Sequence, residues 1–183
     1  AGNLLLTDEG EQIYLGSVFP SENLAWRNDF RYKGINLGLL FTGRIGGICY
    51  SATQANMDLY GVSEVSAAAR DAGGVLINGR EMVDAQKWYQ AIGSQSGLPQ
   101  YYTYSATNVR LQEASIGYTI PRKKLGDVCD ITLSIVGRNL WMLYNKAPFD
   151  PEAVATTSNY YQGIDYFMMP SLRSIGFNVR VKF

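Results

Sequence analysis

Few side chains in this sequence are able to carry out acid–base or nucleophilic chemistry. None of its 183 residues is a histidine, which removes the commonest general base and the commonest metal ligand. The two cysteines, Cys49 and Cys129, match no metal-binding or redox spacing, and we expect them not to be bonded to each other. Cys129 has only Asp130 beside it and no base partner. The sequence therefore predicts a protein that is not an enzyme, with no catalytic residue, no metal site and no cofactor.

The charged side chains are candidates for binding contacts rather than for catalysis. Carboxylates are scattered through segments without a strand pattern, at Asp58, Asp71, Asp84, Asp150, Glu152 and Asp165. They match no calcium-loop spacing, so we expect solvated or loop-capping acids. Arginines fall on the polar faces of predicted strands, where they would contact one another or an enclosed domain: Arg27, Arg31, Arg44, Arg110, Arg138 and Arg180. Lys+Arg and Asp+Glu are 16 each, so no net charge favours nucleic acid as a partner.

Aromatic side chains are the stronger candidates for binding. They make up 13% of the chain, and many lie outside the predicted strands. Exposed aromatics combine an apolar face with a polar edge, which suits contact with a sugar ring or a partner protein. Packing among the loops is the alternative. The candidate contact residues are Trp88, Tyr89, Tyr101, Tyr102, Tyr160 and Tyr161, with Tyr104 and Tyr166 as further members of the set.

Period-2 alternation predicts the elements that carry these residues. Residues 23–34 and 35–47 each place apolar side chains on one face, and the turn at Lys33-Gly34 joins them as a hairpin. Residues 106–121 and 129–141 form a second hairpin, whose first strand changes phase and predicts a β-bulge near Glu113. A final strand over Ile175–Phe183 also alternates.

Two long segments without alternation separate these strands. The first runs from about residue 51 to 103, and Ser63 and Asp84 predict helix starts within it, with ends at Gly73-Gly74 and Gly93. The second runs from about residue 144 to 170. Short and long connections therefore alternate along the chain, which is typical of an up-and-down membrane barrel. The predicted class is all-β.

Strand length and aromatic placement separate a membrane barrel from a soluble sheet. The predicted strands reach ten or more residues, near the 9–11 that cross a bilayer at a tilt. Tyr32 and Tyr118 lie towards one end of the strands, and Trp141 and Tyr144 towards the other, as interfacial girdles do. Two alternatives remain open: a soluble carbohydrate-binding β-sandwich, and a structural outer-membrane barrel without transport.

An ordered set of motifs resembles one family along essentially the whole chain. SATNVRLQEASIGYTIP, IVGRNLWML, FDPE and the closing RSIGFNVRVKF resemble the C-terminal barrel segment of SusC/RagA-type TonB-linked outer-membrane transporters. YKGINLGLLFTGRIGG and DLYGVSEVSAAARDAGG, further upstream, are similar to the same family. The resemblance implies a Gram-negative outer-membrane protein whose whole barrel has about 22 strands, of which residues 1–183 would be roughly the last five, with long extracellular loops containing short helices.

The resemblance also implies partners. Such transporters enclose an N-terminal plug with a TonB box, and pair with a SusD-like surface lipoprotein to import glycans, oligosaccharides or peptides. No plug or TonB box is visible in residues 1–183, and the N-terminal residues lack a signal peptide and a Met, so we expect a piece of a longer protein. Phe177, Val179, Val181 and Phe183 would face outer-membrane lipid and belong to the C-terminal signal read by the barrel-assembly machinery.

Overall fold

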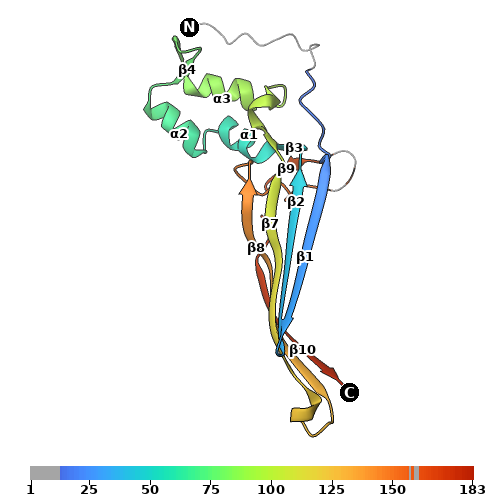
Figure 1. Ribbon diagram of the computed structural model, residues 1–183. Helices are drawn as coiled ribbons and strands as arrows, with labels where there is room; N and C mark the ends of the chain where they lie inside the picture. Colours follow the sequence, from blue (N-terminus) through green and yellow to red (C-terminus); the bar gives the residue numbers. More distant parts are fainter. Residues whose placement is uncertain (1–12, 157, 159–160) are drawn as a thin grey trace. The chain divides into compact units, whose positions relative to one another are not determined.

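The computed structural model describes residues 13–156, 158 and 161–183, which form two compact units (Figure 1). The strand unit comprises Phe19–Gly47, Ala106–Glu152 and Pro170–Phe183. The loop unit comprises the described residues up to Val18, together with Ile48–Ser105 and those of Ala153–Met169. No helix in the described ranges is long and apolar enough to cross a membrane.

The strand unit is one antiparallel sheet of five strands in the order β1-β2-β7-β8-β10 (Figure 1). This order confirms the predicted all-β, up-and-down arrangement. β1 and β10 are its edges, and neither pairs on its outer side with another strand of the described residues. The five strands are β1 (Glu22–Tyr32), β2 (Ile35–Ile45), β7 (Asn108–Ile120), β8 (Asp130–Asn145) and β10 (Ser174–Lys182).

Turn chemistry fixes the first hairpin at the predicted place. Lys33 and Gly34 have φ values of 47° and 90°, and Tyr32 pairs with Ile35 across them. Two successive positive φ values are those of a type I′ turn, whose twist matches that of the flanking strands. β7 and β8 are joined by a longer connection that contains a 3₁₀ turn, Arg122–Lys124.

Irregular pairing explains the change of phase in β7. Leu40 pairs with Glu113 while Phe41 pairs with Leu111, so one residue of β7 is left over between them. This confirms the bulge predicted near Glu113 and keeps apolar side chains on one face along the strand. β8 has two further shifts against β7 that the sequence did not reveal.

The register places apolar residues of all five strands in rows on one face. Cross-strand partners point to the same side of a sheet. One such row crosses every strand: Phe30, Leu37, Ile116, Ile135 and Phe177. The neighbouring positions form a polar row on the opposite face: Arg31, Asn36, Gly117, Ser134 and Asn178.

The loop unit contains three short helices and two small sheets. The helices are α1 (Ala52–Leu59), α2 (Glu64–Asp71) and α3 (Ala85–Gly93). Ser63 and Asp84 accept backbone hydrogen bonds at the starts of α2 and α3, as predicted. The remaining elements are β3 (Ile48–Ser51), β4 (Val75–Ile77), β5 (Glu81–Val83), β6 (Thr103–Ser105), β9 (Ile164–Asp165) and a 3₁₀ turn, Pro99–Tyr102.

A small hydrophobic core joins α1, α3 and the 3₁₀ turn, and Ala69 of α2 packs against it. The core consists of Ala55, Ala85, Tyr89, Ile92 and Tyr102. α1 and α3 approach closely because Gly93 has no side chain: a Cβ there would lie 2.7 Å from the carbonyl oxygen of Ala55. The loop unit therefore has a packed interior of its own.

Candidate functional site

The apolar face of the strand unit is exposed. Phe30, Ile116 and Phe177 are exposed to 57%, 57% and 67%. A soluble sandwich would cover such a face with a second sheet, and no sheet of the described strand unit does so. The predicted assembly residues Phe177, Val179 and Val181 share this face of β10, and Phe183 follows them as an exposed side chain.

Aromatic residues form rows near the ends of this apolar face. Tyr32 and Tyr118 both pair with Ile35, which places all three in one row near the short turn. A second row towards the long connections contains Trp26, Phe41, Leu111 and Trp141. Trp26 and Trp141 are each exposed to 65%. These rows have the placement expected of interfacial aromatics in a membrane barrel.

The opposite face carries charged and polar side chains. Glu113 pairs with Arg138 at 3.1 Å and lies 3.9 Å from Arg27. Further along the face is an open groove of about 430 Å³ whose lining includes Asp29, Arg31, Asn36, Asp130, Asn178, Arg180 and Lys182. The predicted placement of Arg27, Arg31, Arg138 and Arg180 on the polar faces agrees with this arrangement.

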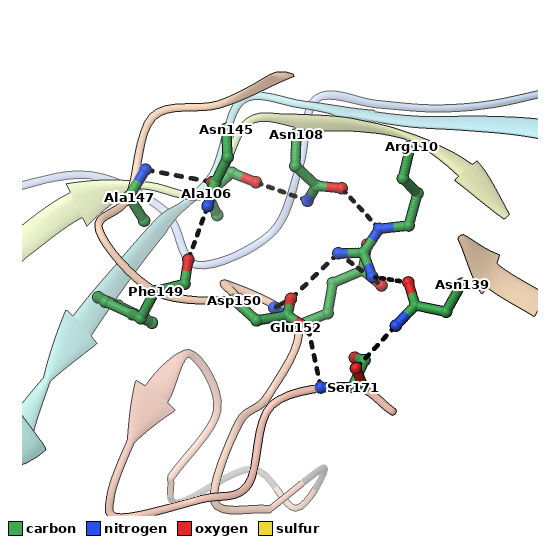
Figure 2. A network of polar contacts seen from close by, with 10 residues as sticks. All are labelled: Ala106, Asn108, Arg110, Asn139, Asn145, Ala147, Phe149, Asp150, Glu152 and Ser171. Carbon is green, nitrogen blue, oxygen red and sulfur yellow. Dashed lines mark hydrogen bonds and ion pairs between the residues drawn. The ribbon is translucent and has the colours of Figure 1, made fainter. Parts of the chain in front are cut away.

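A buried network around Arg110 occupies the end of the polar face near the long connections (Figure 2). Arg110 is 2% exposed, and its Nη2 lies 3.1 Å from Asp150 Oδ1 and 3.4 Å from Glu152 Oε2. Its Nε donates to Asn108 Oδ1 at 3.2 Å, and its Nη1 donates to Asn139 Oδ1 at 3.3 Å. The guanidinium therefore has partners on three sides, as a buried charge requires.

Asp150 ties two separate parts of the chain to this arginine. Its Oδ2 accepts the backbone N–H of Ser171 at 3.1 Å, and its Oδ1 accepts that of Glu152 at 3.1 Å. Burial acts to raise the pKa of Asp150, but hydrogen bonds from Ser171, Glu152 and Arg110 outweigh it and hold the pKa below its ordinary value. Asp150 and Glu152 of the FDPE motif are thus both ion-paired; the side chain of Asp150 is 10% exposed, whereas that of Glu152 remains exposed to solvent.

Two asparagines complete the network and were not among the predicted site residues. Asn139 has a positive φ of 50°, next to one of the register shifts in β8, and its Nδ2 donates to the carbonyl of Ser171 at 2.9 Å. Asn108 donates to the carbonyl of Ala106 at 3.1 Å. Figure 2 shows both side chains turned towards Arg110. The Asn-x-Arg spacing in β7, which puts Asn108 and Arg110 on one face, was the available signal.

The loop unit divides the predicted aromatic contact residues into two groups. Tyr89 and Tyr102 lie in its core, 8% and 2% exposed, where packing is the alternative that the sequence left open. Burial, and next the charge of Asp58, raises the pKa of Tyr102, so its hydroxyl remains protonated. Tyr101 and Tyr161 are exposed, and Trp88 packs edge-on against Tyr101 with ring centroids 5.7 Å apart. Tyr160 lies outside the described residues.

Comparisons with known proteins agree with this architecture. The chain matches no protein-family model. It is 24% identical over 177 residues to "TonB-dependent receptor P3" of Formosa agariphila, an alignment that covers 92% of this chain and 17% of that protein. A solved structure of the RagAB peptide importer in an "open-open" state superposes on 92% of this chain and 18% of the solved chain, with a TM-score of 0.64 at 15% identity.

These findings confirm the resemblance to TonB-linked receptors and the fold of a barrel segment. The chain spans about a sixth of the length of the relative and of the solved chain that it matches.

Proposed function

We propose that residues 1–183 form the C-terminal part of the β-barrel of a TonB-dependent outer-membrane transporter, which imports its substrate actively and is not an enzyme. The similarity to a TonB-dependent receptor over 92% of the chain supports the class of protein. Transport would be a function of the whole receptor. This segment would supply part of the barrel wall and some of the extracellular loops.

The observation that carries this proposal is the exposed apolar row that crosses all five strands, from Phe30 on β1 to Phe177 on β10. An exposed band of this kind is stable where lipid covers it, and the opposite polar face then lines the lumen. The open edges at β1 and β10 would pair with the preceding strand and with the first strand of the barrel, because lipid cannot satisfy unpaired backbone groups.

The partners follow from the receptor class. The polar groove with Asp29, Arg31 and Arg180 would face the plug, which contacts the TonB complex. A SusD-like surface lipoprotein would pair with the extracellular loops, where Tyr101, Tyr161 and Trp88 offer aromatic contacts. The substrate would be a glycan, an oligosaccharide or a peptide. Phe177, Val179, Val181 and Phe183 would serve in barrel assembly.

Quenching of tryptophan fluorescence by brominated phospholipids tests the membrane placement. Trp26 and Trp141 lie in one row of the apolar face, whereas Trp88 belongs to the loop unit. In the intact protein reconstituted in vesicles, we expect bromine on the acyl chains to quench emission from Trp26 and Trp141. A double Trp26→Phe, Trp141→Phe variant should show less of that quenching than the unchanged protein, and Trp88→Phe should keep all of it. Quenching that falls in the Trp88→Phe variant and is unchanged in the double variant would contradict the proposal.

An uptake assay separates a transporter from a passive structural barrel. Cells that carry the intact receptor should accumulate labelled oligosaccharide or peptide only while the proton gradient that drives TonB is maintained. Accumulation that continues after the gradient is dissipated would favour the barrel without active transport.

A further inference from the structure

The three helices of the loop unit surround a hollow of about 290 Å³. Its floor is made by buried residues, among them Asp58 on α1, Ser66 on α2 and Tyr89 on α3. Its mouth is made by exposed side chains, among them Arg70, Gln86 and Gln90. Concave sites with a few polar groups converging on an otherwise partly apolar wall are the usual form of small-molecule sites.

Asp58 is a buried carboxylate without a cation. It is 3% exposed, and the hydroxyl of Ser63 donates to its Oδ1. Within the described part of the chain no lysine or arginine forms an ion pair with it. A buried charge is normally paired or bound to a metal, because desolvation of an isolated carboxylate is costly. The floor of the hollow is therefore suited to a ligand that brings a positive charge.

Arg70 brings the opposite charge to the same hollow. Its Nη1 donates to the carbonyl of Gly61 at 2.6 Å, and no described carboxylate pairs with it. Gly61, with φ +68°, leaves room for this contact, since a Cβ there would lie 2.7 Å from Nη1. The guanidinium is thus held at the mouth with donors left for an anionic group.

We propose that this hollow binds a small zwitterion, a free α-amino acid, with the ammonium at Asp58 and the carboxylate at Arg70. The two protein charges cancel, so a ligand of zero net charge that carries both signs neutralises each of them. A neutral sugar would satisfy Gln86 and Gln90 but leave both charges without a counter-charge. The inference concerns the loop unit alone and does not depend on whether the receptor transports.

Calorimetric titration of the intact, detergent-solubilised protein tests the ligand class with four probes: L-alanine, L-alanine methyl ester, N-acetyl-L-alanine and glucose. The ester lacks the carboxylate, and the acetyl derivative lacks the ammonium. We expect L-alanine to bind, and we expect the affinity of each single-charge analogue to be lower by a factor of about ten or more, as loss of one charge-assisted contact predicts. Glucose should give no heat of binding.

Matched variants assign each charge of the ligand to its residue. Asp58→Asn should lower the affinity for L-alanine by about tenfold, so that L-alanine and N-acetyl-L-alanine bind equally well. Arg70→Gln should make L-alanine and its methyl ester bind equally well. Asp165→Asn is the control, because Asp165 is also buried and bonded to a serine, Ser51, but does not line the hollow. Its affinity for L-alanine should match that of the unchanged protein.

Three results would overturn the proposal. The first is no binding of L-alanine by the unchanged protein up to about 10 mM. The second is equal binding of all three alanine compounds, and the third is preferential binding of glucose, which would make the hollow a sugar site. The probe comparison uses the unchanged protein, so it decides the matter even if Asp58→Asn does not fold.

Discussion

In the strand unit, large apolar side chains such as Phe30, Ile135 and Phe177 are more than half exposed, whereas in the loop unit Ile92 and Tyr102 are 5% and 2% exposed. Polar side chains do not divide in this way, because each unit has both exposed and buried ones: Arg31 is exposed and Arg110 buried in the strand unit, and Gln86 is exposed and Asp58 buried in the loop unit. The strands thus leave large apolar side chains exposed on one face, as the proposed contact with lipid requires, whereas the loop unit buries some of its own in a core.

The two units obtain their stability from different contacts. The loop unit buries a core against itself and caps its helices, so internal contacts hold it. The strand unit has hydrogen-bonded ladders and an ion network, and in the proposed barrel its apolar face would be covered by lipid and its two edges by neighbouring strands. Mutations should therefore cost free energy for different reasons in the two units.

The largest effect on stability is expected at Arg110, because it is a buried charge in the strand unit. Arg110→Met would leave the Asp150 carboxylate, whose side chain is only 10% exposed, without its cation, and loss of one member of a buried pair costs about 3–5 kcal/mol. Urea unfolding of the intact protein in detergent measures the cost. Arg31→Met, on the same face but exposed, is the control and should change stability by less than about 0.5 kcal/mol.

The next effect tests which face meets lipid. Phe177→Arg should destabilise the barrel by about 2–4 kcal/mol if the site lies near the bilayer midplane, because a charge would enter hydrocarbon. Asn178→Arg points to the polar groove and should be nearly neutral. Folding titrations into lipid vesicles compare the two variants, and equal costs would reject the assignment of the faces.

A smaller effect contrasts two glycines, one in each unit. Gly93→Ala would place a Cβ 2.7 Å from the Ala55 carbonyl oxygen in the packed loop unit, and overpacking of this kind costs about 1–3 kcal/mol. Gly43→Ala in the strand unit would meet no atom closer than 3.8 Å, so it should be neutral or slightly stabilising. Thermal unfolding of the two variants measures the difference.

The pKa of Asp150 predicts how the strand unit responds to acid. Because the folded-state pKa lies below the ordinary value of about 3.9, the stabilisation by Asp150 is complete above that value and is lost as the pH falls through the folded pKa. Unfolding titrations between about pH 6 and 2 should show this loss. Asp150→Asn should be less stable at neutral pH and should show a shallower loss on acidification. An unchanged slope in that variant would contradict the role given to Asp150.

The sequence predicted those features that depend on local spacing. Alternation located the strands, the change of phase at Glu113 located a bulge, and Ser63 and Asp84 marked two helix starts. The sequence did not predict contacts between residues that are far apart along the chain. Arg110 and Asp150 are 40 positions apart, and no periodicity reports their pairing. α1 was missed because Ala52–Leu59 lies in a segment where its serine cap, Ser51, also ends a strand.

The sequence does not predict which loop aromatics are buried, for a related reason. A tyrosine in a polar segment suits both a binding surface and a small core, and only the packing of α1 against α3 decides between them. Tyr89 and Tyr102 entered the core, while Tyr101 and Tyr161 remained exposed. The same packing created the hollow beside Asp58, whose members lie on three helices and share no sequence motif.

The smallest expected effect concerns the cap of α3 and tests whether the loop unit depends on local contacts. Asp84 Oδ1 accepts the backbone N–H of Lys87 at 3.1 Å, which satisfies one of the free donors at the helix start. Asp84→Ala should cost about 1 kcal/mol, while Asp84→Asn, which keeps an accepting oxygen, should cost only a few tenths. Hydrogen exchange of the α3 amides in the intact protein measures both. Because exchange reports local opening, protection should fall in α3 and stay unchanged in β7 and β8. An equal fall in those strands would mean that the two units unfold together and would remove the contrast between them.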